Sequence, residues 1–436
     1  MKDSLYATSL TSAAKEIAIG ALTARALAEA ALERIAATDG AIQAWAHLDP
    51  AYVRRMADRC DAARDATPLR GIGVGIKDII ATADLPTEMG SPIYAGHRPT
   101  ENAECVRRLL NAGGYVFGKT VTTAFAFLDP GKTRNPWRAE HTPGGSSSGS
   151  AAAVAAGHVV GALGTQTNGS VIRPASYCGV VGFKPTKDAI PFTGVHIFSD
   201  TLDQIGVFTR SIADASRLAS ALCDRGFVSP SVAALPAPPR LAYLGDYPWV
   251  TMDCDADDTL EAAVTRLRQF GATVIGVEFP RSWHEAHLVH RTIMLYEGAR
   301  NLGALQERER ARLSPKLNEA LDEGRRISAA DYELAQKRRT QAITDCTEWL
   351  DDFDAVLSPS AIGTAPFGLG STGDPSCCSM WSLTGFPALN LPVGVSGDGL
   401  PVGLQIACPQ GADDRLLTVA AWCESKLGFR GLLQAA

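Results

Sequence analysis

Residues 141–186 read HTPGGSSSGSAAAVAAGHVVGALGTQTNGSVIRPASYCGVVGFKPT, and this stretch decides the fold and the chemistry that the chain supports. Two Gly/Ser clusters, residues 144–150 and 165–170, flank an apolar segment rich in alanine. Upstream, Lys77 lies in the sequence GIGVGIKD of residues 71–78, an apolar run that predicts a buried strand. Serines in two glycine-rich turns and a lysine in an apolar setting are the components of a Ser-Ser-Lys site for acyl transfer.

Lys77 can act as a base only in its neutral form. A serine hydroxyl attacks poorly until a base removes its proton, and burial lowers the pKa of a lysine by disfavouring its charged form. Adjacent side chains on a strand point to opposite faces, so we expect Asp78 to point away from Lys77. Two alternatives stay open at this point. Lys77 could be a strand-end lysine that reaches solvent, and His141 or His158 could pair with a serine instead.

The chain resembles the amidase signature family of amide hydrolases. The resemblance covers nearly the whole chain, and its motifs occur in the family's order: residues 71–90, 112–120, 135–136, the serine stretch, 199–210, 384–388 and 399–405. It implies an α/β fold with a large mixed twisted β-sheet that helices cover on both faces. It also implies that His141 and His158 hold no catalytic position.

The resemblance assigns a role to each residue of the site. Ser170 aligns with the family's nucleophile, Ser146 with its bridging serine and Lys77 with its general base. Ser146 would then relay a proton from Ser170 to Lys77, and later from Lys77 to the departing nitrogen. An oxyanion hole would consist of preorganised backbone N–H groups, those of Thr167, Asn168, Gly169 and Ser170.

Three positions depart from the common family pattern. Gln166 stands where many members carry aspartate, and Asn168 stands where many carry glycine. Arginine comes one residue late, because Ile172 holds its usual position and Arg173 follows. The pairing of Gln166 with Arg173 resembles malonamidase-type members, which act on small carboxylated amides. We therefore expect Gln166 and Arg173 to bind substrate, with Arg173 holding a carboxylate bidentately; the alternative is an Arg173 that pairs with a buried acid.

The predicted function is hydrolysis of the C–N bond of a small amide through an acyl-enzyme on Ser170, with a carboxylated substrate held by Arg173. Carbamate, urea-like or aryl amide substrates are alternatives, because the same chemistry cleaves them. An alternative from another class is an amidotransferase component that works with partner proteins, although the shifted arginine argues against it. A non-catalytic scaffold is disfavoured, since Lys77, Ser146 and Ser170 are all present.

Composition is typical of a globular enzyme. The chain has 436 residues, of which 46% are apolar and 20% charged, and its net charge of −6 gives no basic footprint for nucleic acid. Ten cysteines lack any C-x-x-C pair, and residues 151–164 are too short an apolar run to span a bilayer. We expect a cytoplasmic enzyme without metal or cofactor. Its partner is a small amide substrate, with at most a second copy of the chain in a homodimer.

We expect a single amidase domain over residues 1–436, with residues 226–345 forming a variable, mostly helical section over the substrate mouth. Periodicity predicts one helix over residues 12–37 and another over 50–64, with Asp49 as the N-cap. Residues 286–321 are expected to be helical, with a break near Pro315.

Other motifs receive structural interpretations. Residues 113–120 match a nucleotide-binding loop, but a helix rather than a strand is predicted before them. Residues 145–149 match a nucleophile elbow without the strand that it needs, so Ser147 is expected to bond the turn. His284, His287 and His290 are expected to lie at the surface or to line a pocket, and Tyr296 and Glu297 are expected to face the pocket. Cys377, Cys378 and Trp381 are expected to pack, with a place in the substrate site as the alternative.

Overall fold

The computed structural model describes residues 2–63, 67–429 and 431. Its centre is one sheet of eleven strands in the order β1-β3-β2-β4-β6-β5-β10-β11-β9-β7-β8. The strands are β1 (Trp45–His47), β2 (Gly73–Lys77), β3 (Tyr115–Thr120), β4 (Ala162–Gln166), β5 (Val181–Lys184), β6 (Gln204–Thr209), β7 (Arg240–Tyr243), β8 (Thr273–Gly276), β9 (Ala355–Pro359), β10 (Ala388–Val395) and β11 (Pro401–Ala407).

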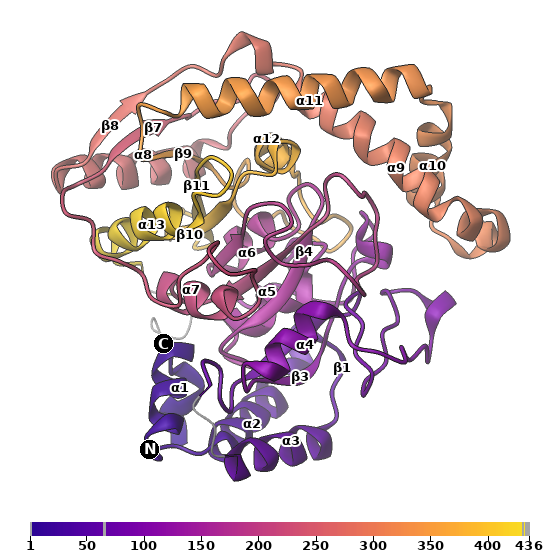
Figure 1. Cartoon of the computed structure of the whole chain (residues 1–436), viewed down its shortest axis with the longest axis vertical. Coiled ribbons are helices and arrows are strands. Elements are labelled where there is room, and N and C mark those ends of the chain that lie inside the picture. The colour runs from indigo at the N-terminus through magenta and orange to yellow at the C-terminus, as the bar shows by residue number, and fades with distance from the viewer. Residues whose placement is uncertain (1, 64–66, 430, 432–436) are drawn as a thin grey trace.

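The sheet is mixed. β2 runs parallel to β3 and β4, and β7 runs parallel to β8 and β9, whereas the six other pairings are antiparallel. Helices cover it (Figure 1): α1 (Leu10–Ala18), α2 (Ala24–Ile42), α3 (Pro50–Ala62), α4 (Glu104–Asn111), α5 (Ser148–Ala155), α6 (Ile172–Cys178), α7 (Ile212–Ser220), α8 (Cys254–Gln269), α9 (Ala286–Glu309), α10 (Pro315–Arg326), α11 (Ala329–Trp349), α12 (Ser379–Thr384) and α13 (Asp413–Leu427). The predicted fold class is confirmed.

The predicted helix over residues 12–37 is wrong, because two helices occupy this region. Gly20 adopts a φ of 76°, which ends α1, and the Thr23 side chain accepts a hydrogen bond from Ala26 N to begin α2. The apolar residues keep helical spacing across the break, so periodicity alone does not reveal it. The predicted N-cap of the next helix is confirmed, since Asp49 accepts from the N–H groups of Ala51 and Tyr52.

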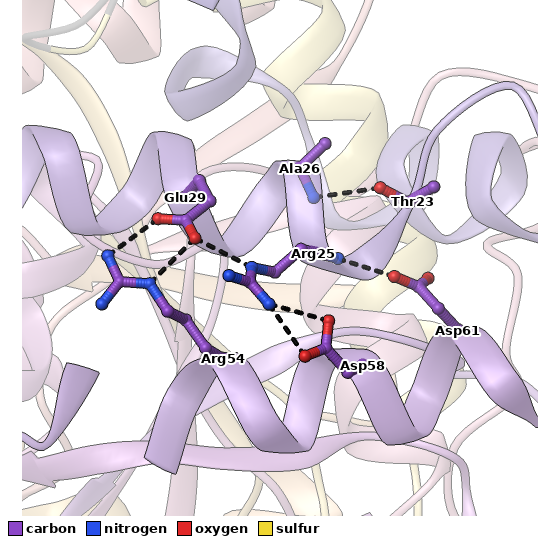
Figure 2. Close-up of polar contacts among 7 residues, drawn as sticks. All are labelled: Thr23, Arg25, Ala26, Glu29, Arg54, Asp58 and Asp61. Carbon is purple, nitrogen blue, oxygen red and sulfur yellow. Dashed lines mark hydrogen bonds and ion pairs between the residues drawn. The ribbon is translucent and has the colours of Figure 1, made fainter. Parts of the chain in front are cut away.

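Charged side chains join α2 to α3 (Figure 2). Arg25 bonds Asp58, while Arg54 reaches Glu29, which Arg25 also contacts within α2. Asp61 accepts from the backbone N–H of Arg25 at the start of α2. These pairs are partly exposed, so each contributes little by itself, but together they fix how the two helices lie.

Residues 226–345 mix strands with helices. β7 and β8 extend the main sheet, and α9, α10 and α11 form a helical arm beside it (Figure 1). The break near Pro315 is confirmed, because α10 begins at Pro315 with Ser314 as its N-cap. The long α9 passes the loop that follows β4 and so reaches the candidate site.

Close packing places α5, the helix of the serine stretch, against the sheet. α5 contacts β2, β3 and β4, and its residues are all buried. At Gly149 a Cβ would lie 2.3 Å from Ala44 O and 2.4 Å from Val121 N, so only glycine fits. Small residues therefore let α5 lie directly against the ends of the strands that carry Lys77 and Gln166.

Candidate active site

Lys77 ends β2 with its side chain fully buried. Its Nζ donates to Ser146 Oγ at 2.7 Å and to Thr165 Oγ1 at 2.8 Å. Burial lowers the pKa of Lys77 well below its usual value, and the charge of Asp203 opposes that shift without cancelling it. The alternative of a solvent-reaching lysine is therefore excluded, and burial favours the neutral form of Lys77.

Asp78 points to a different partner, as the strand alternation predicts. Its carboxylate lies 3.5 Å from Lys119 Nζ and accepts from Glu88 N. Lys119 also donates to Ile80 O and Thr87 Oγ1 in the interior. The segment that matches a nucleotide-binding loop therefore continues into β3, and its lysine serves packing of the core.

Ser146 and Ser147 lie just before α5 and take different roles. The Gly145–Ser146 peptide bond is cis, and Ser146 is 1% exposed with its hydroxyl accepting from Lys77. Ser147 Oγ donates to Thr165 O and accepts from Thr165 N. Ser147 thus has the expected structural role, but it bonds β4 rather than its own turn, and these bonds tie the first serine cluster to β4.

The loop of residues 167–170 carries Ser170 into a cavity. Among the described residues, no hydrogen bond engages the Ser170 hydroxyl or the backbone N–H groups of Asn168, Gly169 and Ser170. The loop itself is held from behind, because Ser382 Oγ donates to Asn168 O at 2.5 Å. Free N–H groups beside a free hydroxyl are the elements that an oxyanion hole needs.

Gln166 anchors this loop to the next helix. Its Oε1 accepts from Val171 N at 2.8 Å and Ile172 N at 3.0 Å, and its Nε2 donates to Ser382 Oγ. These bonds occupy the Gln166 side chain at the start of α6. The structure thus brings Gln166 to the site but places it against the protein, so substrate contact by Gln166 stays a prediction.

A cavity of about 320 Å³ lies over the loop. Ser170, Asn168 and Arg173 border it on one side, and His287, His290 and Met294 of α9 border it on another. The cavity has the size of a small-molecule site. Of the three histidines expected at the surface or in a pocket, His287 and His290 border this cavity and His284 is exposed.

Arg173 is 3% exposed and borders the cavity from the first turn of α6. One terminal nitrogen donates to Gly145 O at 2.7 Å and to Thr372 Oγ1 at 3.2 Å. Its Nε and other terminal nitrogen have no partner within the described chain, and no described acid forms an ion pair with it. Burial lowers the pKa of Arg173, and interactions with Tyr177, Cys378 and Asp374 partly offset this shift. The alternative of a buried acid partner is therefore not observed.

Asp203 and His290 hold the loop from the side, a contact that the sequence did not predict for either residue. Asp203 accepts from Thr167 Oγ1 at 2.6 Å and from the backbone N–H groups of Phe198 and Ser199. Its burial raises its pKa to about 6. His290 contacts Thr167 O at 2.9 Å. Asp203 lies within the motif of residues 199–210, but only the fold shows that it faces Thr167.

The remaining candidates lie elsewhere. His158 bonds Thr38 and Trp45, and His141 bonds Ala365 O, so neither pairs with a serine. Glu297 is buried among Ser199, Thr201 and Tyr332 rather than facing the cavity.

Four more candidates do not border the cavity. Tyr296 stacks on Tyr332 at 4.2 Å between ring centres. Trp381 and the cysteines 377 and 378 are buried in one apolar cluster. Across the described ranges, no group of three or more potential metal ligands occurs.

Comparison with known proteins identifies the class. The amidase family model matches residues 26–417, so the chain belongs to the amidase family. Its fold and site thus define an enzyme that acts on linear carbon–nitrogen bonds of amides. No helix in the described part of the chain combines the length and apolarity needed to cross a membrane.

Named relatives cover nearly the full chain. A glutamyl-tRNA(Gln) amidotransferase subunit of Oleidesulfovibrio alaskensis is 32% identical, covering 97% of this chain and 98% of the relative. The corresponding protein of Exiguobacterium sibiricum is 34% identical, covering 87% and 89%.

Solved structures show the same fold. A crystal structure described as an amidase has a TM-score of 0.87 at 29% identity and covers 97% of this chain and 100% of its own. The peptide amidase of Stenotrophomonas maltophilia has a TM-score of 0.82 at 29% identity, with 97% of each chain covered.

Proposed function

We propose that the chain hydrolyses a small amide through an acyl-enzyme on Ser170. The observation that carries this proposal is the fully buried Lys77, whose Nζ lies 2.7 Å from Ser146 Oγ. A lysine kept neutral by burial is a base without any further partner. Ser170 borders the adjoining cavity, where a carbonyl carbon can meet its hydroxyl.

In the proposed reaction, Ser170 Oγ bonds the carbonyl carbon as its proton passes to Ser146, and the Ser146 proton passes to Lys77. The negative oxygen forms beside the N–H groups of the 167–170 loop. Collapse of this intermediate breaks the C–N bond, and Lys77 returns its proton through Ser146 to the leaving nitrogen. Water then releases the acid by the same relay and restores the Ser170 hydroxyl.

One contact that the proposed proton relay needs, between Ser170 and Ser146, is not formed in the structure. No hydrogen bond joins Ser170 to Ser146 among the described residues. Hydrogen bonds between catalytic groups often tighten only when substrate is bound. We therefore assign this contact to the substrate complex.

Arg173 supports a carboxylated substrate. Its buried guanidinium keeps two nitrogens without partners beside the cavity, and leaving such groups unpaired costs free energy. A carboxylate would satisfy them and balance the buried charge. Small acids that carry an amide, such as malonamate, combine this group with a scissile C–N bond.

An amidotransferase component is the second candidate, and the named relatives favour it over a free-standing hydrolase. Both relatives, at 32% and 34% identity, belong to glutamyl-tRNA(Gln) amidotransferases. Such a component would also release ammonia from an amide but would pass it to a second substrate. The shifted position of Arg173 is the feature of this chain that argues for the free-standing enzyme.

Ammonia release from a panel of amides tests the proposal. The panel pairs malonamate and glutamine with uncharged and aryl amides of similar size, using wild type, Ser170→Ala and Arg173→Ala. We expect turnover that requires Ser170 and a carboxylate preference that requires Arg173. Glutamine turnover that appears only with co-expressed partner proteins would favour the amidotransferase, and turnover retained in Ser170→Ala would overturn the mechanism.

A further inference from the structure

His290 contacts the loop of residues 167–170 and also borders the cavity. Its side chain lies on α9 and is 1% exposed, and its Nε2 is 2.9 Å from Thr167 O. It also borders the cavity that Ser170 and Arg173 share. The amide-hydrolysis chemistry described above gives this imidazole no role.

The contact with Thr167 fixes the tautomer of His290. A carbonyl oxygen only accepts hydrogen bonds, so Nε2 must carry the hydrogen. Burial lowers the pKa of His290 to about 4, which keeps the ring neutral near pH 7. A neutral imidazole has one N–H, so Nδ1 carries a lone pair, and this atom has no partner within the described chain.

The cavity holds a second imidazole, that of His287, whose Nδ1 also lacks a partner in the described chain, but His290 is the histidine bonded to the loop that carries Ser170. Arg173 presents N–H donors, and Asn168 does too, because its Oδ1 already accepts from Ser379 Oγ. Arg291 is paired with Glu323, and Asp374 is an exposed carboxylate at the cavity. His290 Nδ1 thus adds a buried neutral acceptor beside the loop that carries Ser170.

We propose that His290 determines substrate specificity by accepting a hydrogen bond from an O–H or N–H group near the scissile carbonyl. The substrate class is then small amides that carry a hydroxyl or amino group on the acyl part. His290 also positions Thr167 through its other nitrogen. This inference rests on the proposed hydrolysis at Ser170, but it does not depend on a carboxylate at Arg173.

Two matched pairs of amides test the inference. Propionamide is compared with 2-hydroxypropionamide, and malonamate with 2-hydroxymalonamate, by the ratio of their kcat/KM values. A site built to bond a donor rejects analogues that lack it, so wild type should prefer the hydroxylated member by about tenfold or more. The ratio cancels any general loss of activity in a variant.

Two variants separate the nitrogens of the ring. His290→Gln keeps an amide N–H within reach of Thr167 O but removes the acceptor at Nδ1, so the preference should fall below about threefold. His290→Asn places an amide oxygen near the Nδ1 position and should keep more of the preference. His284→Gln is the control, since His284 bonds Phe279 O outside this cavity and should leave the ratio unchanged.

The outcomes distinguish the inference from the proposed function. Turnover without a hydroxyl preference in wild type, or a preference unchanged in His290→Gln, overturns the inference alone. Hydrolysis of none of the four amides by wild type overturns the proposed function and the inference together. A hydroxyl preference that persists in Arg173→Ala supports His290 independently of the carboxylate proposed at Arg173.

Discussion

Lys77 Nζ and Ser146 Oγ lie 2.7 Å apart, and both side chains are buried. Thr165 Oγ1 accepts from the same lysine at 2.8 Å, so the nitrogen is surrounded by hydroxyl groups instead of a carboxylate. The charge of Asp203 acts against this, but that carboxylate is bound by Thr167 and backbone N–H groups. Burial lowers the pKa of Lys77 and so favours its neutral form, which the proposed mechanism requires.

Lys77→Met should lower kcat/KM by at least about a thousandfold, because the three residues act as a unit. The same change should stabilise the fold near pH 7. The pKa of folded Lys77 is lowered, so the unfolded chain binds the proton more tightly and the folded form is penalised at neutral pH.

This penalty shrinks as pH rises toward the ordinary lysine value of 10.5. Urea unfolding of wild type and Lys77→Met at pH 7 and pH 10 measures this penalty. A variant that is less stable than wild type at pH 7, or a gain that grows with pH, would contradict a neutral buried lysine.

Asp203→Asn should move the acid limb of the kcat/KM profile to lower pH. The Asp203 charge raises the pKa of Lys77, so its removal lets that pKa fall further. Asparagine still offers an oxygen to Thr167 Oγ1, which limits structural damage. The measurement is a pH–rate profile above pH 6, because burial raises the pKa of the wild-type carboxyl to about 6 and it is ionised only above that pH. A shift to higher pH would show that Asp203 acts by another route.

Gly149→Ala should destabilise the protein by about 2–4 kcal/mol, because a Cβ there would overlap backbone atoms that cannot move aside. Gly276→Ala is the control, since a Cβ at that position meets nothing within 4 Å. Thermal unfolding of the two variants gives the comparison. Equal melting temperatures would mean that α5 does not approach β3 as closely as described.

Arg173→Met should lower kcat/KM for carboxylated amides by about tenfold to a hundredfold more than for neutral amides of similar size. The reason is the loss of charge-assisted hydrogen bonds to the carboxylate. Because Arg173 also bonds Gly145 O, both substrate types should lose some activity, and their ratio is the informative quantity. An unchanged ratio would assign Arg173 to holding Gly145 and Thr372 alone.

The sequence predicted the chemistry of the site better than its surroundings. The lysine at the end of an apolar run and the serine turns carry local signatures, and the resemblance to the amidase signature family singled out Lys77 and Ser146 before their contact was known. His290 could not be singled out, because three histidines at three-residue spacing drift around a helix, and only tertiary packing decides which one faces Thr167. The helix break at Gly20 was missed because apolar spacing continues through it.

In the proposed mechanism, Ser170 carries the acyl group. Rapid quenching of the enzyme with an activated ester or amide, followed by peptide mapping by mass spectrometry, shows where the acyl group is attached. We expect an added acyl mass on the peptide that contains Ser170, located at that serine and absent from Ser170→Ala. An acyl group located on Ser146, or an adduct that persists in Ser170→Ala, would show that Ser170 is not the nucleophile.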